Sequence, residues 1–518
     1  MDTRSILEKE IAVDAFSEPD RDAIDCVAGY PAPYRVGMAN LGFHFLYHGL
    51  RRSRKLRIER VFSDIAPVTL ESGSRINSRA ILFFSISYEE DYINLVRMLR
   101  RAGVSALRVK REGRPLLIVG GPAASANPAP LAPIADAISL GEGEGTIGGI
   151  IKVLEENGAA DPGAVLEGLT RIPGMFVPGC SRSGVRFNEP AAISRFPRSS
   201  IITSESAFPG TFLVESGRGC PGACSFCLAT SLYRPFRFMP LGDFEEMLRE
   251  LPRPVARVGL VSTAVAASPD FVPVVKLLVS KGIAVSFSSL RAEDLDEEKA
   301  RLIGEIGTAS VSLAPESGSE RLRYALGKRV ADEVYFSAAA RLRAAGVSHF
   351  TLYLLFGVPG ERGVHIAETM AFLKRFRQSI GDRHFSVHIN PLVPKAWTPL
   401  EFFGMGEAHE LARRQRELEK SLRKLGLRVQ IKSIRSAVRQ ALLSTGDEAV
   451  GLAIVHHAEG ELSWKQALRR AGVNERVPHE RKGPETSFPW DGISGPARRG
   501  SLYTRFETIE RESAAGTS

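Results

Sequence analysis

The sequence has little cysteine and no long apolar run. Five of its 518 residues are cysteine, a sparse and odd number that argues against a disulfide framework and favours a reducing compartment. No run of about 18 apolar residues is present, so no membrane-spanning helix is predicted. The charged N-terminal segment MDTRSILEKEIAVDAF also lacks the apolar stretch of a signal peptide. We therefore expect a cytoplasmic protein without a membrane partner.

Strong net charge and internal repeats are absent as well. The 68 Lys and Arg residues and 59 Asp and Glu residues give a net charge of +9. This excess is mild for the length, and it permits an anionic partner without requiring one. A hydrophobic share of 44% suits a sizeable core, and the length predicts two or three domains.

Short apolar runs alternate with amphipathic stretches in the first third of the chain. RAILFFSIS (79–87), PLLIVGG (115–121) and ADAISL (135–140) are typical of buried strands, and helical spacing follows them. This alternation predicts a doubly wound, Rossmann-like α/β domain over residues 1–158. Residues 159–208 are rich in Pro, Gly, Ser and Arg, which predicts a linker.

A second series of strands and helices follows the predicted linker. Its candidate strands are TFLVES, RVGLVST, AVSFSSLR, ASVSLAPES, HFTLYLLFGVPG and HFSVHINPLVP. Six strands with intervening helices predict an α/β fold of the partial (β/α)6 barrel type over residues 209–400. Chemistry in such barrels lies at the carboxyl ends of the strands. Residues 401–518 are predicted to form a mostly helical extension with a loop-rich tail.

Three of the five cysteines lie within eight residues, directly after the first of these strands. Cys220, Cys224 and Cys227 have the spacing C-x3-C-x2-C. A structural zinc site would need a fourth ligand from elsewhere in the fold. A [4Fe–4S] cluster is usually held by four thiolates, so three would leave one iron with an open position for a small molecule. A zinc knuckle and a chance grouping of thiols are the alternatives.

The motif, its place after a strand and the aromatic Phe226 resemble the radical S-adenosylmethionine (SAM) superfamily. The resemblance implies that the three cysteines hold a [4Fe–4S] cluster whose open iron chelates SAM. It further implies that an electron cleaves SAM to methionine and a 5′-deoxyadenosyl radical, which abstracts hydrogen from a substrate. An external electron donor of the flavodoxin or ferredoxin type would be needed, and the substrate is unknown.

Other strand ends resemble the SAM-binding elements of that superfamily. Arg291 could hold the SAM carboxylate, or it could form a surface salt bridge with Glu293 or Asp294. Glu316 could accept hydrogen bonds from the ribose or ammonium of SAM, or it could be an acid at a helix start. The predicted cofactor contacts are Phe226, Ser262, Ser288, Arg291, Glu316, Gly357 and Val393.

Two motifs of related proteins are missing. STAVAASPD stands where the superfamily usually has Gly-Gly-Glu, which leaves Ser262, Thr263 or the backbone to contact the methionine amine. The N-terminal domain resembles the cobalamin-binding-like domain that precedes many radical SAM barrels, but it lacks D-x-H-x-x-G. His44 and His48 do not have that spacing. Because the domain as a whole resembles a cobalamin-binding one, cobalamin stays a candidate cofactor despite the missing motif. Cobalamin-dependent methyl transfer is accordingly an alternative function.

GEGTIG, residues 143–148, formally matches a dinucleotide-binding motif between a strand and a helix. Glu142 and Glu144 would face the pyrophosphate, however, and like charges oppose binding there. A tight turn whose acids satisfy a helix start is the favoured interpretation.

The predicted helical extension carries a basic stretch at residues 411–439. Ten Lys and Arg residues stand there against Glu417 and Glu419, but aromatic residues are absent. A solvated helix packing by its leucines is favoured, and an RNA or ribosomal target is the alternative. The tail contains PWDGI (489–493), and the whole order of elements resembles an uncharacterised branch of the superfamily. A radical SAM enzyme is the leading hypothesis, and a non-catalytic iron–sulfur or RNA-binding protein is the other alternative.

Overall fold

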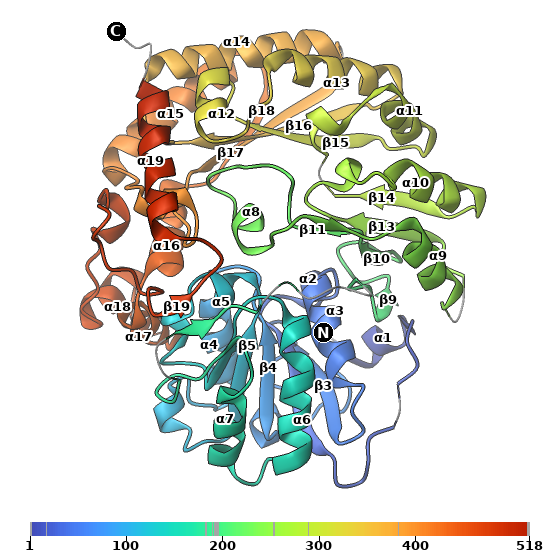
Figure 1. Cartoon of the computed structure of the whole chain (residues 1–518), viewed down its shortest axis with the longest axis vertical. Coiled ribbons are helices and arrows are strands. Elements are labelled where there is room, and N and C mark those ends of the chain that lie inside the picture. Colours follow the sequence, from blue (N-terminus) through green and yellow to red (C-terminus); the bar gives the residue numbers. More distant parts are fainter. Residues whose placement is uncertain are drawn as a thin grey trace.

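The computed structural model describes residues 3–16, 18–181, 184–188, 190, 196–251, 254–288, 290–381, 383–460 and 462–514. An N-terminal α/β unit lies against a barrel-like unit, and the C-terminal helices run along one side of both (Figure 1). No helix among the described residues is both long enough and apolar enough to cross a membrane.

The N-terminal unit is built on one twisted sheet with the strand order β3-β2-β4-β5-β6-β7. All neighbouring strands are parallel except β6 and β7. Its strands are β2 (Ile24–Tyr30), β3 (Leu56–Phe62), β4 (Ile81–Ser85), β5 (Leu116–Gly120), β6 (Ala137–Ser139) and β7 (Met175–Phe176). The predicted strands and the doubly wound arrangement are confirmed, whereas β2 and β3 were not predicted.

Helices cover both faces of this sheet, so its strands are buried on both sides. In β4, Phe83 packs with the core on one face and Phe84 with the core on the other, which accounts for the continuous apolar run. The helices of this unit are α1 (Thr3–Leu7), α2 (Tyr34–Gly37), α3 (Leu41–Leu50), α4 (Asp91–Arg101), α5 (Pro122–Ala126), α6 (Ile147–Asn157) and α7 (Pro162–Thr170). Helices α3 and α6 contact each other, and α4 contacts α17 (Glu448–Ala458) of the C-terminal extension.

The region predicted as a linker, residues 159–208, carries structure that joins it to its neighbours. It contains α7 and β7, and β7 pairs with β6. The short β9 (Ile201–Thr203) pairs with β1 (Glu10–Ala12), and β8 (Val185–Arg186) pairs with β19 (Ile493–Ser494) near the end of the chain. The division of the chain into four segments stays a prediction.

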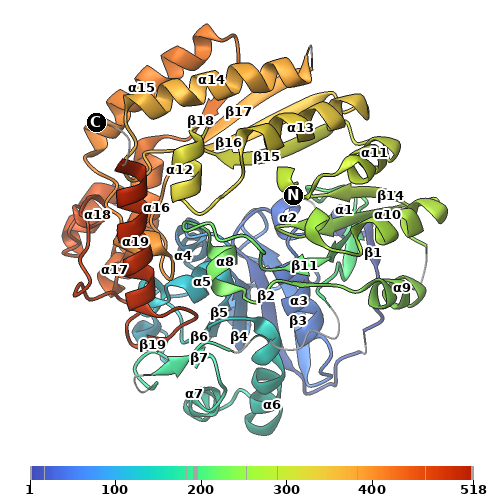
Figure 2. The same ribbon diagram turned by 45° about the horizontal axis from the view of Figure 1, so that its top comes forward.

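The second unit contains all six predicted strands in sequence order. They are β10 (Phe212–Glu215), β13 (Arg257–Val261), β14 (Ala284–Phe287), β15 (Ser310–Glu316), β16 (His349–Phe356) and β17 (His384–Pro391). The first three and the last three form separate parallel sheets, which curve as the two parts of an open arc (Figure 2). The intervening helices are α8 (Leu228–Leu232), α9 (Leu241–Arg249), α10 (Phe271–Ser280), α11 (Glu297–Glu305), α12 (Glu320–Ala325), α13 (Asp332–Ala344) and α14 (Gly363–Ile380).

The C-terminal extension adds a seventh parallel strand, β18 (Arg428–Ile431), beside β17. The sequence predicted a mostly helical extension and did not single out this strand, whose sequence RVQI is short. The helices are α15 (Ala408–Lys424), α16 (Ile434–Thr445), α17, α18 (Trp464–Arg470) and α19 (Arg499–Ala514). Leu411, Leu418 and Leu422 of α15 are buried, as the packed-helix interpretation predicted.

Several basic residues of the stretch 411–439 form ion pairs within the chain. Arg414 lies 3.0 Å from Glu361 behind β16, and Arg439 lies 2.9 Å from Glu90 at the start of α4. These pairs attach the extension to both other units, so part of the positive charge is used for internal packing.

The Pro-Trp-Asp element packs against the end of the barrel. Trp490 is buried beside Trp397, which follows β17. The Glu401 carboxylate accepts a hydrogen bond from the Trp397 amide at 2.8 Å and is only 2% exposed. Burial raises the pKa of Glu401 to about 8.

This buried carboxyl predicts a pH-dependent stability. With a folded pKa of about 8 and an unfolded pKa of about 4.3, its neutral form stabilises the fold at low pH, and this contribution is lost as pH rises through 8. The Glu401→Gln variant stays neutral, so its free energy of unfolding should fall less between about pH 5 and about pH 9 than that of the wild type. Urea unfolding of the apo protein measures this. The exposed Glu407→Gln variant is the control, and parallel curves for Glu401→Gln and the wild type would contradict the assignment.

Candidate functional site

The cysteine loop (residues 219–227) starts just after β10 and the short β11 (Gly217–Arg218), which pairs with β12 (Arg237–Phe238). Gly219 has φ +79°, and a Cβ there would lie 2.1 Å from the carbonyl oxygen of Tyr233. Its own carbonyl accepts a hydrogen bond from the Thr263 hydroxyl, at the end of β13. The loop therefore needs a glycine at its entry, and the neighbouring strand holds it in place.

The turn after α12 supports the other half of the cysteine loop. The Ser225 amide donates to the Leu326 carbonyl oxygen at 2.8 Å. Gly327 has φ +83°, and a Cβ there would lie 2.2 Å from the carbonyl oxygen of Ala223. The Thr230 hydroxyl of α8 donates to the carbonyl oxygens of Cys224 and Cys227 at 3.0 and 2.8 Å. The loop is thus fixed at both ends and in the middle.

The three thiols are partly buried and gather on this loop. A Cβ on Gly222 would lie 3.4 Å from the Cys220 sulfur and 4.0 Å from the Cys224 sulfur, so the bare glycine leaves space between them. Burial raises the pKa of Cys224 to about 12 and also raises the pKa of Cys227. Isolated thiolates are therefore unfavourable here, and a cationic iron centre would compensate for the charge when the thiols lose their protons.

The chemistry of this donor set fits an iron–sulfur cluster. Three thiols on one loop match the soft ligands that such clusters take. Among the residues that the structure describes, no three Cys, His, Asp or Glu side chains are placed to hold a single metal ion.

Two cations lie beside the cysteine loop. The Arg291 guanidinium is 3.9 Å from the Cys220 sulfur, and it also forms an ion pair with Glu293 at 2.6 Å. Both predicted interpretations of Arg291 are therefore compatible with its position. Lys328 lies 3.4 Å from the Glu316 carboxylate at the end of β15, where burial raises the pKa of Glu316.

The other predicted cofactor contacts lie at strand ends around the arc. The Ser288 hydroxyl donates to the Ser262 carbonyl oxygen at 2.5 Å, which joins the ends of β14 and β13. Gly357 follows β16, and its amide donates to the Glu361 carboxylate at 2.8 Å. Phe226 and Val393 are partly buried against the barrel core. The structure thus places Arg291 beside the Cys220 sulfur, and it places Gly357 against Leu411 of α15.

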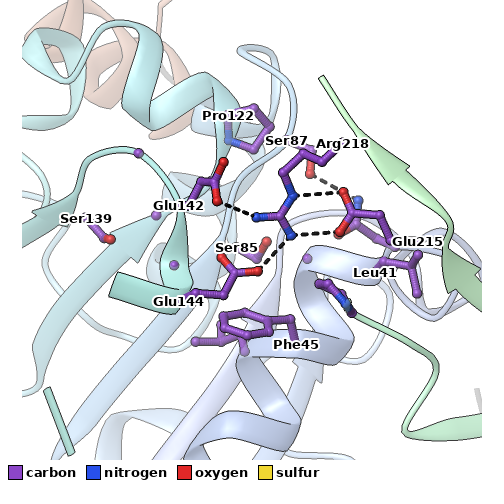
Figure 3. Close-up of a pocket in the computed structure, with 18 of the residues that line it drawn as sticks. Leu41, Phe45, Ser85, Ser87, Pro122, Ser139, Glu142, Glu144, Glu215 and Arg218 are labelled. Atoms are coloured by element: carbon purple, nitrogen blue, oxygen red, sulfur yellow. Dashed lines mark hydrogen bonds and ion pairs between the residues drawn. The ribbon is translucent and has the colours of Figure 1, made fainter. Parts of the chain in front are cut away.

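A cavity of about 710 Å³ lies between the N-terminal sheet and the cysteine loop. Its walls come from α3, the carboxyl ends of β4, β5 and β6, the start of α6, and residues 215–219 and 261–263 of the barrel. Most of these walls are apolar, and Phe45 and Ser85 lie inside (Figure 3). Because Ser262 also lines it, the cavity opens toward the strand ends where SAM contacts were predicted.

A buried charged cluster lines this cavity; we call it the Arg218 cluster (Arg218, Glu142, Glu144 and Glu215). The Arg218 guanidinium donates to Glu142 at 3.0 Å, to Glu144 at 2.7 Å and to Glu215 at 2.7 and 2.9 Å (Figure 3). Arg218 is 11% exposed and Glu142 is 4% exposed, so both units bury these charges against each other. The two glutamates of the GEGTIG region thus bind an arginine of the barrel. The turn itself is present, but the Glu142 side chain makes no capping hydrogen bond to a described amide, so the predicted role of these acids at a helix start is not observed.

The two histidines near the first loop serve the packing of the N-terminal unit. His44 is fully buried, and its ring nitrogens lie 3.0 Å from the Ser200 hydroxyl and 3.1 Å from the Met38 carbonyl oxygen. His48 lies 3.0 Å from the Asp14 carboxylate. Neither histidine lines the cavity.

Two family profiles match the two units of this chain. The profile described as "Radical SAM proteins, N-terminal" matches residues 42–178, and that of the "Radical SAM superfamily" matches residues 214–373, which include the cysteine loop. The chain belongs to the radical SAM superfamily. It is an enzyme of that superfamily, whose members use a [4Fe–4S] cluster and SAM and need a substrate and a reductant.

Relatives of this radical SAM enzyme occur in archaea. A protein of Methanocaldococcus jannaschii, "Uncharacterized protein MJ0966", is 29% identical over 425 residues, which cover 81% of this chain and 88% of the relative. "Uncharacterized protein MK0932" of Methanopyrus kandleri is 31% identical over 184 residues, 31% of this chain and 34% of the relative.

Solved structures similar to this radical SAM enzyme include the methyltransferase TsrM from Kitasatospora setae with cobalamin and a [4Fe–4S] cluster bound. It is 14% identical, with coverage of 73% of this chain and 74% of that chain and a TM-score of 0.48. The cobalamin-dependent SAM radical enzyme OxsB is 16% identical, with coverage of 77% and 56% and a TM-score of 0.48.

Sequence reasoning missed several residues of the site. Arg218 stands next to Gly217 and Gly219 and was read only as part of the loop, although its partners Glu142 and Glu144 were noted. Lys328 closes the ESGSERLRYALGK segment, and only the fold shows that it returns to Glu316. A basic residue two positions before the first cysteine, together with two acids in another glycine-rich turn, is the signal that could have connected Arg218 with its partners.

Proposed function

We propose that this enzyme reductively cleaves SAM at a [4Fe–4S] cluster held by Cys220, Cys224 and Cys227, and that radical chemistry on a substrate follows. The observation that carries the proposal is the glycine-supported loop bearing three thiols at the carboxyl end of the first barrel strand. When bound, the cluster supplies the electron that divides SAM into methionine and a 5′-deoxyadenosyl radical.

The chain's own residues would orient SAM beside that cluster. Arg291 and Glu316 are near enough to the thiols to contact the carboxylate and the ammonium or ribose of SAM. The joined strand ends at Ser262 and Ser288 would position its methionine portion. Phe226, Gly357 and Val393 complete the proposed contacts. The cavity beside Ser262 supports a substrate bound between the two units, away from bulk water.

The partners follow from this chemistry. A low-potential protein of the flavodoxin or ferredoxin type would reduce the cluster. The scarcity of cysteine and the need for reduced thiols support a cytoplasmic location. An RNA or ribosomal target has weaker support, because basic residues of the stretch 411–439 already pair with Glu361 and Glu90.

Anaerobic reconstitution tests the proposal. The wild-type protein should bind about four iron atoms per chain and, with dithionite and SAM, release 5′-deoxyadenosine and methionine in equal amounts. A folded protein that takes up iron but leaves SAM intact would contradict the proposal, and so would one that binds zinc in its place.

Cobalamin-dependent methyl transfer is a second candidate, and the cavity is the observation that favours it. The cavity lies at the carboxyl edge of a parallel sheet, the usual place for a cofactor in this fold. Ser85 is 7% exposed and lines it, and its hydroxyl makes no hydrogen bond with any described residue. A bound ligand could supply the missing partner.

We expect hydroxocobalamin to co-elute with the wild-type protein if this second candidate is right. Ser85→Phe should obstruct the cavity and abolish cobalamin retention, whereas Ser85→Ala should weaken retention by about tenfold or less, because only one hydrogen bond is lost. Absorbance spectra after gel filtration give the stoichiometry. If the wild-type protein cleaves SAM but retains no cobalamin, the second candidate is wrong, and the cavity is then assigned to the substrate.

A further inference from the structure

The last helix of the chain lies against the cysteine loop. Helix α19 packs on α12, whose following turn holds the loop through the Ser225 amide. Figures 1 and 2 both show α19 beside α12 on the side of the barrel that faces α8. The cysteine loop is therefore contacted by a segment that follows it by some 280 residues.

Arg505 of α19 makes the contacts that join these segments. Its Nη2 donates to the Ala325 carbonyl oxygen at 2.6 Å, at the end of α12. Its Nε donates to the Ser225 hydroxyl at 3.3 Å. Ser225 is 4% exposed and stands between Cys224 and Cys227. One guanidinium thus bridges the support of the loop and the loop itself.

We propose that Arg505 is a positioning residue that keeps Cys224 and Cys227 in the arrangement that holds the cluster. The Ser225 side chain and its amide are fixed from two directions, by Arg505 and by Leu326. Loss of one restraint lets the loop sample other conformations, in which the two thiols separate. A fixed cation beside the loop also favours the negatively charged, reduced state of a cluster.

The rest of α19 is anchored without this arginine, which makes the proposal testable. Phe506 and Ile509 are fully buried in the barrel core, and Phe506 packs beside Phe402. Arg505→Ala should therefore leave the helix docked and change only the restraint on the loop. Arg511, which is exposed on the same helix, offers a matched control of equal charge.

Hydrogen exchange of the apo protein is the first measurement. In Arg505→Ala, amides of residues 223–228 should exchange about tenfold faster, the effect of losing a charge-assisted hydrogen bond. Arg505→Lys keeps the charge but lacks the forked guanidinium, so its exchange rates should lie between those of Arg505→Ala and the wild type. Arg511→Ala should exchange like the wild type, and the melting temperatures of all variants should agree within a few degrees.

The reconstituted protein gives a second measurement. Chelator-driven iron loss should be about tenfold faster in Arg505→Ala, and its reduction potential should be more negative than that of the wild type. If Arg505→Ala has the same amide exchange rates, rate of iron loss and reduction potential as the wild type, the proposal is wrong. Hydrogen exchange is measured on the apo protein, so this test does not depend on SAM cleavage. A wild-type enzyme that binds iron but leaves SAM intact would contradict the proposed function and would leave the proposal for Arg505 standing.

Discussion

The Cys224→Ser variant will lose the iron–sulfur cluster and reduce SAM cleavage to the background rate. The hydroxyl of serine is a hard ligand with a far higher pKa than a thiol, so it cannot replace a thiolate on iron. With two cysteines left on the loop, one of the three proposed protein ligands of the cluster is gone. Iron analysis after anaerobic reconstitution and detection of 5′-deoxyadenosine measure both effects.

Cys180→Ser is the matched control for this substitution. Cys180 is a free, exposed thiol outside the cysteine loop, so its replacement should change neither the iron content nor the rate. If Cys224→Ser keeps wild-type iron and activity, the cysteine loop does not hold the cluster. Loss of the cluster in both variants would indicate a general effect of thiol removal instead.

Arg218→Met will destabilise the apo protein by about 3–5 kcal/mol, because it removes the shared cation of the buried Glu144 and Glu215 carboxylates and leaves Glu142 with Arg237 alone. Burial already raises the pKa of Glu215 even with Arg218 present. Protonation of the carboxylates relieves their repulsion, so the deficit of the variant should shrink as pH falls from about 8 toward about 5. Urea unfolding at several pH values measures the difference.

Two further variants make this test specific. Arg171→Met removes an exposed ion pair with Glu167 and should cost less than about 1 kcal/mol. In Arg218→Met/Glu144→Gln, one of the opposing charges is gone, so part of the stability should return. If Arg218→Met lowers the free energy of unfolding as little as Arg171→Met does, the Arg218 cluster contributes little to stability.

The elements that could be predicted have simple local patterns. The six barrel strands stand out because each is a short apolar run that ends before a polar or glycine-rich turn, and the cysteine spacing identifies the loop after the first strand. β2 was missed because its sequence IDCVAGY contains Asp25 and Gly29. In the fold, Gly29 is where the Phe84 ring of β4 packs, since a Cβ there would lie 2.3 Å from that ring.

The charged part of the site could not be derived from local patterns. Arg218 meets Glu142 and Glu144 across the contact of two units that lie far apart in the sequence, and each residue alone fits an ordinary surface position. Arg505 and Ser225 are separated in the same way. Pairings of this kind depend on how the units pack, so motif and periodicity do not reveal them.

The position of α19 has a consequence for how the enzyme is made. The segment that completes the wall around Ser225 leaves the ribosome 280 residues after the thiols themselves. The nascent chain therefore presents Cys224 and Cys227 without that wall until α19 has been made, and iron delivered earlier would meet an unfinished binding site. Iron insertion into this enzyme should accordingly follow the synthesis of α19.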